Sequence, residues 1–210
     1  IIHWVASFES FIFTNISSTF ILMIASYGLL IALILWWKKK SLIRTILVLS
    51  AIILVQIILI KNKLEFGNSK EWVVLNASKK TIICQRIGNE IEVISNGLQS
   101  EEIQKNMTLQ NYATGTFSAI TKESSLKNVA YFNRNRILIL DNSSVYLPNN
   151  QADILLLTAS PKVNLERILK NNRPKMVVAD ASNYKSLVNL WEQTCNQQKI
   201  PFHSTREKGY

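Results

Sequence analysis

The sequence contains few of the residues that build nucleotide, metal or thiol sites. Its 210 residues include six glycines, two histidines and two cysteines. The glycines are scattered, and the lack of a glycine-rich loop argues against a phosphate cradle. Cys84 and Cys195 form neither a CxxC nor a Cys/His pattern, which argues against a zinc site. We therefore expect no cofactor and no resident metal. Whether the two cysteines pair, or are simply small buried side chains, stays open.

Acidic residues are also scarce, with 14 Asp and Glu against 24 Lys and Arg, a net charge of +10. Residues 1–66 hold six Lys/Arg and two acids, giving +4, and residues 67–210 hold eighteen and twelve, giving +6. Such a mild excess favours nucleic acid or anionic lipid headgroups as partners, although a solvated surface is the plainer interpretation.

Two long runs contain no charged residue. Residues 20–37 form the first, and a helix of this length, at about 1.5 Å per residue, matches a hydrocarbon core. Trp36-Trp37 at its end are typical of the interfacial aromatic belt. Residues 45–60 form the second run. No small-residue cleavage site follows the first run, so the sequence predicts two transmembrane helices, about 20–37 and 42–60, and not a signal peptide.

The cations between the two runs predict the orientation of this hairpin. Two lysines follow the second run and none precedes the first, whereas the loop holds Lys38, Lys39, Lys40 and Arg44. Positive-inside bias places that loop in the cytoplasm and both flanks on the outer side. Because the chain begins with Ile1 and not Met, we expect a fragment or a processed product. Residues 1–19 would then lie at the membrane interface or end a preceding buried region.

From residue 67 onward the pattern changes to short strands and helices. Gly88-Asn89 suits a hairpin turn, and residues 100–128 are ambiguous. Antiparallel strands first and a β-α-β-α-β pattern later predict a layered α/β sandwich. The expected strands are 72–78, 81–87, 90–95, 136–141, 145–148, 152–157, 175–180 and 200–205.

Two helices are expected in the second half. Ser160 is a favoured N-cap and Pro161 a favoured first helical residue. Helical spacing predicts that the first helix buries Leu165, Ile168 and Leu169, and that the second buries Leu187, Leu190, Trp191 and Cys195.

Candidate chemistry is sparse. Asp141, Asp153 and Asp180 fall at strand edges, where α/β enzymes place acids, although such aspartates more often bind turn amides. His203 lies in a strand near the C-terminus. A Ser–His–Asp triad could combine Ser160 or Ser182 with His203 and Asp180, but no nucleophile elbow supports it.

Two membrane spans and a strand-rich start precede the run ILILD…ADILLLTASPKVNLERILKNNRPKMVVADASN…W…C…IPFHSTREKG. This order resembles the end of the ComEC family, competence proteins that form the inner-membrane channel for single-stranded DNA. The resemblance is strongest over 136–209 and looks closest to versions from Bacteroidetes-like bacteria. It implies a membrane α-helical hairpin followed by an α+β, αββα-sandwich soluble domain that is metallo-β-lactamase-like, over residues 67–210.

The resemblance also implies that the metal site is degenerate. Active relatives end a strand with a PHHGS-type stretch, where this chain has TASP, and the HxDxDH motif has no counterpart because no histidine lies between Ser95 and Arg136. A two-metal hydrolase needs roughly four to six His/Asp ligands. We therefore expect no catalytic and no metal-binding residues. The degenerate positions are Asp141, Thr158, Ala159, Ser160, Asp180 and Asn183.

These expectations combine into a multi-pass protein of the bacterial inner membrane with its soluble domain on the periplasmic side. It would be the C-terminal part of a channel for single-stranded DNA uptake in natural transformation, and its domain would be a non-catalytic scaffold or DNA guide. The expected partners are single-stranded DNA, the remaining channel helices, the lipid bilayer and other competence proteins.

Two alternatives remain open at this point. The first is a membrane-anchored, metal-dependent hydrolase or nuclease that uses Asp141, Asp180 and His203 with one ion. The second is a two-span membrane protein whose outer domain binds a protein partner.

Overall fold

The computed structural model describes residues 19–77, 80–97, 100–145 and 151–209. All but the last residue of the segment expected over residues 1–19, and most of the strand expected over 145–148, lie outside these ranges. The chain divides into two compact units. One comprises Ile1–Ser69, Ile87–Asn89 and Gln110–Ala119, and the other comprises Lys70–Arg86, Glu90–Leu109 and Ile120–Tyr210.

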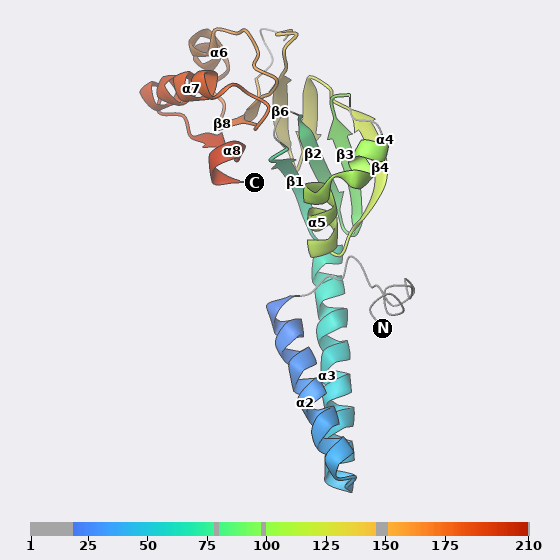
Figure 1. Ribbon diagram of the computed structural model, residues 1–210. Helices are drawn as coiled ribbons and strands as arrows, with labels where there is room; N and C mark the ends of the chain where they lie inside the picture. Colours follow the sequence, from blue (N-terminus) through green and yellow to red (C-terminus); the bar gives the residue numbers. More distant parts are fainter. Residues whose placement is uncertain (1–18, 78–79, 98–99, 146–150, 210) are drawn as a thin grey trace, which may run out of the picture. The chain divides into compact units, whose positions relative to one another are not determined.

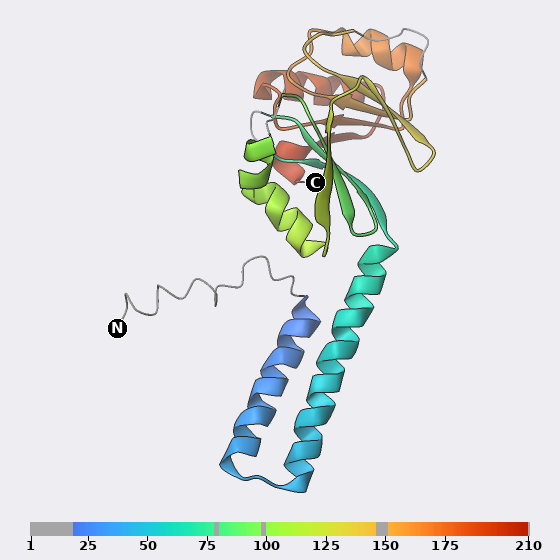
Figure 2. The same ribbon diagram turned by 90° about the vertical axis from the view of Figure 1, so that its right-hand side faces the viewer.

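The first unit contains a helical hairpin, formed by α2 (Phe20–Lys38) and α3 (Leu42–Gly67), which run antiparallel (Figure 2). Thr19 and Ser41 cap the two N-termini, each accepting a hydrogen bond from the backbone N–H three residues on. Both helices are long and apolar enough to cross a membrane. The second helix continues past the apolar run to Gly67, because its last turns contain polar residues that are compatible with a helix.

Few side chains of the hairpin are buried between its two helices. Leu22, Ala32 and Val48 are the buried apolar residues in the described part of the hairpin. At the open end, the Asn62 Nδ2 donates to the Thr19 Oγ1 at 3.0 Å. Most other large apolar side chains of the two helices are exposed in the isolated chain. This surface fits contact with lipid tails or with further apolar helices.

The second unit contains two β-sheets. The first sheet has the order β1-β2-β3-β4, and the second has the order β5-β6-β7-β8-β9. Strands β5 and β6 are antiparallel, whereas β6, β7, β8 and β9 are parallel. The strands are β1 (Lys70–Leu75), β2 (Ile82–Ile87), β3 (Glu90–Ser95), β4 (Ala119–Ser125), β5 (Val129–Phe132), β6 (Asn135–Leu140), β7 (Ile154–Leu157), β8 (Met176–Ala179) and β9 (Phe202–Ser204).

The two sheets pack face to face around an apolar core. Val74 and Ile83 of the first sheet contact Ile137, Ile139 and Leu156 of the second. Neighbouring residues of β6 and β7 point the other way, because side chains alternate along a strand. That outer face packs against α6 (Leu165–Asn172) and α7 (Lys185–Gln197). Both faces are therefore buried, which explains why β6 and β7 are uninterrupted apolar runs.

A short helix lies on the outer side of the first sheet. This helix, α4 (Ser100–Lys105), buries Ile103, and α5 (Met107–Gly115) follows it. The second unit is thus layered as helix, sheet, sheet and helix (Figure 1). The ambiguous segment 100–128 contains these two helices and β4, and α8 (Thr205–Lys208) ends the described chain.

Four details of the sequence prediction were wrong. Val145 is not part of a strand. The strand expected over 200–205 is shorter, and Thr205 begins α8 instead. Leu190 is exposed, because the buried stripe of α7 runs through Val188, Trp191 and Cys195. The helix expected from Pro161 begins only at Leu165, because Ser160 has a positive φ and Asn164 is the N-cap.

Candidate functional site

A buried cluster of polar side chains occupies the carboxyl ends of two neighbouring parallel strands. Thr158 directly follows β7 and Asp180 directly follows β8, so the parallel pairing brings them to the same edge of the sheet. Thr81, which precedes β2, reaches the same point from the first sheet. The Thr81 Oγ1 lies 2.6 Å from the Asp180 Oδ2, and the Thr158 Oγ1 lies 3.0 Å from it. The two threonine hydroxyls also bond to each other.

The second carboxylate oxygen of Asp180 is held by its own loop. The Oδ1 accepts bonds from the Ser182 backbone N–H at 3.1 Å, from the Ser182 Oγ at 2.5 Å and from the Asn183 Nδ2 at 3.0 Å. Asn183 also donates to the Leu157 backbone carbonyl at 2.7 Å, which ties this loop to β7. We name Thr81, Thr158, Asp180, Ser182 and Asn183 the hydroxyl–aspartate cluster.

The turn after β7 completes the cluster. The Ala159 backbone N–H donates to the Ser182 Oγ at 2.7 Å, and the Ser160 backbone N–H donates to the Asn183 Oδ1 at 2.7 Å. Both residues adopt left-handed conformations, with φ of +53° and +57°. Non-glycine residues pay an energetic cost in this region, so the hydrogen bonds hold a strained turn in place.

This turn explains why Ser160 is not the helix N-cap. An N-cap residue needs an extended backbone, whereas Ser160 has a positive φ. Its Oγ accepts a bond from the Tyr184 backbone N–H at 2.9 Å instead of from a helix amide. The cap is Asn164, whose Oδ1 accepts from the Arg167 backbone N–H at 3.0 Å, and α6 therefore begins at Leu165.

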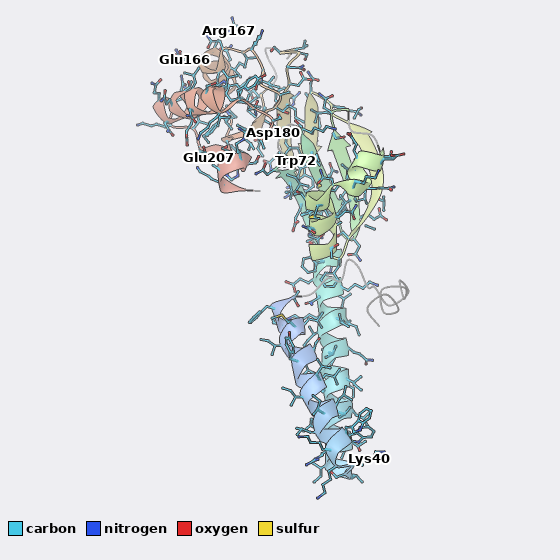
Figure 3. The ribbon with its side chains drawn as sticks, in the orientation of Figure 1. Lys40, Trp72, Glu166, Arg167, Asp180 and Glu207 are labelled. Carbon is cyan, nitrogen blue, oxygen red and sulfur yellow. The ribbon has the colours of Figure 1, made fainter. Side chains whose placement is uncertain are left out.

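Burial controls the electrostatics of the cluster. Asp180 is 1% exposed, and Figure 3 shows it inside the domain, whereas Glu166 and Arg167 extend from the outer side of α6. Burial raises the pKa of the Asp180 carboxyl above its ordinary value, and hydrogen bonds from Ser182, Thr81 and Thr158 oppose that rise. Three donors bond to the Oδ1, and the linked pair of threonine hydroxyls bonds to the Oδ2, so the carboxylate acts as an internal anchor between β2, β7 and β8.

The remaining predicted site residues lie apart from the cluster in the hydrogen-bond network. Asp141 follows β6 and accepts bonds from the Ser143 backbone N–H at 3.0 Å and from its Oγ at 2.5 Å. This is the turn-capping role that the plainer interpretation predicts. The His203 Nε2 lies 2.8 Å from the Gly209 backbone oxygen. Its ring lines a cavity of about 260 Å³ with Trp72, Met176 and Thr205.

The described residues do not assemble the triad considered from the sequence. The Ser182 Oγ bonds to Asp180, the Ser160 Oγ bonds to the Tyr184 amide, and no hydrogen bond within residues 19–209 as described links either serine to His203. In the same described ranges, no group of three or more His, Cys, Asp and Glu side chains lies close enough to hold a metal ion.

The structure brings together five of the six degenerate positions expected from the sequence, and it adds Thr81 to the cluster, a residue that the sequence did not indicate. Thr158, Ala159, Ser160, Asp180 and Asn183 meet at one point, whereas Asp141 does not bond to them. Thr81 was missed because it lies 77 residues from Thr158, and only the packing of one sheet on the other brings them into contact.

Of the four cations expected in the hairpin loop, Lys38 is the last residue of α2, Lys39 and Lys40 lie between the helices, and Arg44 lies in the first turn of α3. The Arg44 Nη1 donates to the Leu35 carbonyl at 2.7 Å and to the Lys39 carbonyl at 3.3 Å, satisfying carbonyls at the end of α2. Lys40 lies at the tip of the hairpin (Figure 3) and its Nζ is 5.7 Å from the centre of the Trp36 ring.

Cys84 and Cys195 do not form a disulfide. Both are free and fully buried. Cys195 belongs to the core between α7 and the second sheet, whereas Cys84 lies on β2 of the first sheet. Burial raises the pKa of each thiol to about 12, which keeps them protonated.

Comparison with known proteins gives a family. No curated protein and no solved structure matches the chain. A family model described as the ComEC C-terminal domain matches residues 72–210, which include the hydroxyl–aspartate cluster and both sheets except the first two residues of β1. The match covers well over half of the chain, and the protein therefore belongs to the ComEC family, of which it contains the C-terminal domain.

Proposed function

We propose that this chain is the C-terminal part of an inner-membrane channel for uptake of single-stranded DNA, and that its α/β domain is a non-catalytic scaffold or DNA guide. The observation that carries the proposal is the family match over residues 72–210, which associates the chain with competence and DNA uptake. The two long apolar helices agree with the membrane association of that family.

The hairpin supports a place among other membrane helices. Two helices that bury only three apolar side chains between them leave a large apolar surface for lipid and for neighbouring helices. With Lys38, Lys39, Lys40 and Arg44 at one end, positive-inside bias puts that end in the cytoplasm. The opposite end, which leads to β1, then faces the periplasm in a multi-pass protein.

The α/β domain is, in this proposal, a degenerate metallo-β-lactamase-like fold. Its helix–sheet–sheet–helix layers are consistent with that fold. The turn that corresponds to the histidine-bearing stretch of active relatives carries Thr158, Ala159 and Ser160, which bond to Asp180, Ser182 and Asn183. This network uses the polar groups of the turn internally, and it supports a structural role for them.

An uptake assay in the bacterium that encodes the chain tests the proposal. Removal of residues 72–210 should abolish entry of fluorescently labelled DNA into the cytoplasm and should lower the transformation frequency to background. The matched variant Asp180→Asn, which keeps the shape of the cluster, should retain both. Full uptake by the truncated protein would contradict the proposal.

Metal analysis and a DNA-cleavage assay distinguish this proposal from the hydrolase alternative. The full-length protein, purified in detergent, should contain no stoichiometric transition metal and should not cleave DNA. Bound zinc or manganese together with phosphodiesterase activity that is lost in Asp180→Asn would establish a metal-dependent nuclease instead.

Orientation is tested with a cysteine probe. Because both native cysteines of this chain are fully buried, Lys40→Cys adds the accessible thiol of residues 1–210. A membrane-impermeant maleimide should label this thiol only after the inner membrane is permeabilised. Labelling from the periplasm would show that the hairpin has the opposite orientation.

A further inference from the structure

The cavity beside His203 lies between the two sheets, at one edge of the α/β domain. The end strand of the first sheet is β1 and that of the second is β9, and residues of both line the cavity. Its volume is about 260 Å³. A cavity of about 150 Å³ engineered into another protein holds benzene, so this one has room for a larger ring compound.

The walls of the cavity are apolar. Ile154 of β7 and Val178 of β8 line it from the face that packs towards the first sheet. Met176 pairs with Ile154 and lies on the same face. All three are partly exposed, so the first sheet leaves this end of the five-stranded sheet incompletely covered. No Lys, Arg, Asp or Glu of the described chain lines the cavity, which therefore suits an uncharged, apolar group.

Two polar groups of the lining residues have no hydrogen-bond partner in the part of the chain that the structure describes. They are the Trp72 Nε1 and the Thr205 Oγ1, and both atoms are buried. Thr205 as a whole is 1% exposed. Buried polar groups are nearly always paired, so an unpaired one indicates a partner that the described chain does not itself supply. The indole N–H can only donate and the hydroxyl can donate too, so a single acceptor suits both groups.

We propose that this cavity binds a small, neutral, largely apolar molecule that carries a carbonyl oxygen. Its hydrocarbon part would pack against the apolar walls, and its oxygen, with two lone pairs, would accept from the Trp72 Nε1 and the Thr205 Oγ1. Ligand pockets commonly combine apolar walls with a few polar groups that fix the orientation of the ligand. A carboxylate is disfavoured, because no Lys or Arg of the described chain lines the cavity and an unpaired charge is costly to remove from water. The site shares no residue with the hydroxyl–aspartate cluster.

A matched pair of ring compounds tests the site. Acetophenone carries a carbonyl oxygen, and α-methylstyrene has the same shape with a CH₂ group in place of that oxygen. The full chain in detergent micelles is labelled with 5-fluorotryptophan, and the ¹⁹F resonance of Trp72 is the one that Trp72→Phe removes. Equilibrium dialysis sets the free concentration of each compound. Acetophenone should shift the Trp72 resonance saturably and bind about tenfold more tightly than α-methylstyrene, which leaves both donors unpaired.

Variants assign the binding to this cavity and to its donors. Thr205→Val removes the hydroxyl and keeps the shape of the side chain, so it should weaken acetophenone binding about threefold and leave α-methylstyrene binding unchanged. Val178→Phe fills the cavity and should abolish the binding of both compounds. Val145→Phe is its matched control, because Val145 is 65% exposed and does not line the cavity, and it should bind like the wild type. An unchanged resonance of Trp191, which lies in the apolar core, shows that each variant is folded.

Absence of a saturable shift with acetophenone would overturn the proposal, since trapped water would then serve the two donors. Equal affinity for the two compounds, or an acetophenone affinity that Thr205→Val leaves unchanged, would also overturn it, because the donors would then contribute nothing. A shift that persists in Val178→Phe would place the binding elsewhere and overturn it as well. DNA uptake by the truncated protein tests the proposed function separately, whatever these titrations show.

Discussion

Substitution of Asp180 tests whether the hydroxyl–aspartate cluster is a structural anchor. In Asp180→Ala, the Ser182 backbone N–H loses its acceptor, and the Thr81 and Thr158 hydroxyls keep only each other and Ser182. An unsatisfied buried donor costs about 1–3 kcal/mol, and the removed carboxyl leaves a small cavity. We therefore expect Asp180→Ala to lower the free energy of unfolding of the α/β domain by about 3–5 kcal/mol.

Asp180→Asn should be much milder. The remaining oxygen can stay at the position of the Oδ1. The Ser182 backbone N–H and the Asn183 Nδ2 lie there, and both groups can only donate hydrogen bonds. The new NH₂ then lies at the Oδ2 position, where the Thr81 and Thr158 hydroxyls can rotate to accept. The loss of two charge-assisted bonds is partly offset by the removal of a buried charge, and the expected cost is about 1 kcal/mol.

The assay is urea unfolding of the full chain in detergent micelles, followed by circular dichroism. Asp141→Ala is the matched control, since Asp141 also ends a strand but bonds only within its own turn to Ser143. It should cost less than about 1 kcal/mol. The anchor interpretation fails if Asp180→Ala costs no more than Asp141→Ala, or if Asp180→Asn costs as much as Asp180→Ala.

Three further predictions follow from buried groups. Because the pKa of Asp180 is raised by folding, the wild type should lose stability relative to Asp180→Asn as pH rises from the ordinary aspartate range through the raised pKa. Parallel stability-versus-pH curves for the two proteins would contradict this. Arg86 is fully buried and its Nη2 lies 2.8 Å from the Oε1 of the partly exposed Glu71. Glu71→Gln should therefore cost about 1–2 kcal/mol in urea unfolding, since water screens the partly exposed carboxylate, and more than Arg86→Met, which removes the buried charge itself; the reverse order would be inconsistent with this burial. Cys84 and Cys195, with their buried thiols, should react with an aromatic disulfide reagent at pH 8 only after unfolding, and fast labelling of the folded protein would show that one of them is accessible.

Much of the fold could be predicted from residue patterns, because the patterns are local. Apolar runs predict α2 and α3, and the turn at Gly88-Asn89 occurs as expected, with Gly88 at a φ of +64°. The continuous apolar strands β6 and β7 predict a sheet that is covered on both faces. Helix boundaries were less predictable. Ser160-Pro161 has the composition of a helix start, but hydrogen bonds from a distant loop hold Ser160 in a left-handed turn.

The sequence by itself determined the class of the protein: two membrane-compatible helices, a layered α/β domain and the scarcity of histidine. Only the tertiary structure decided which polar groups meet. Thr81 joins Asp180 because the two sheets pack on each other. Periodicity along a chain specifies which face of an element is apolar, whereas contact between residues far apart depends on how those faces pack, and no local pattern encodes that.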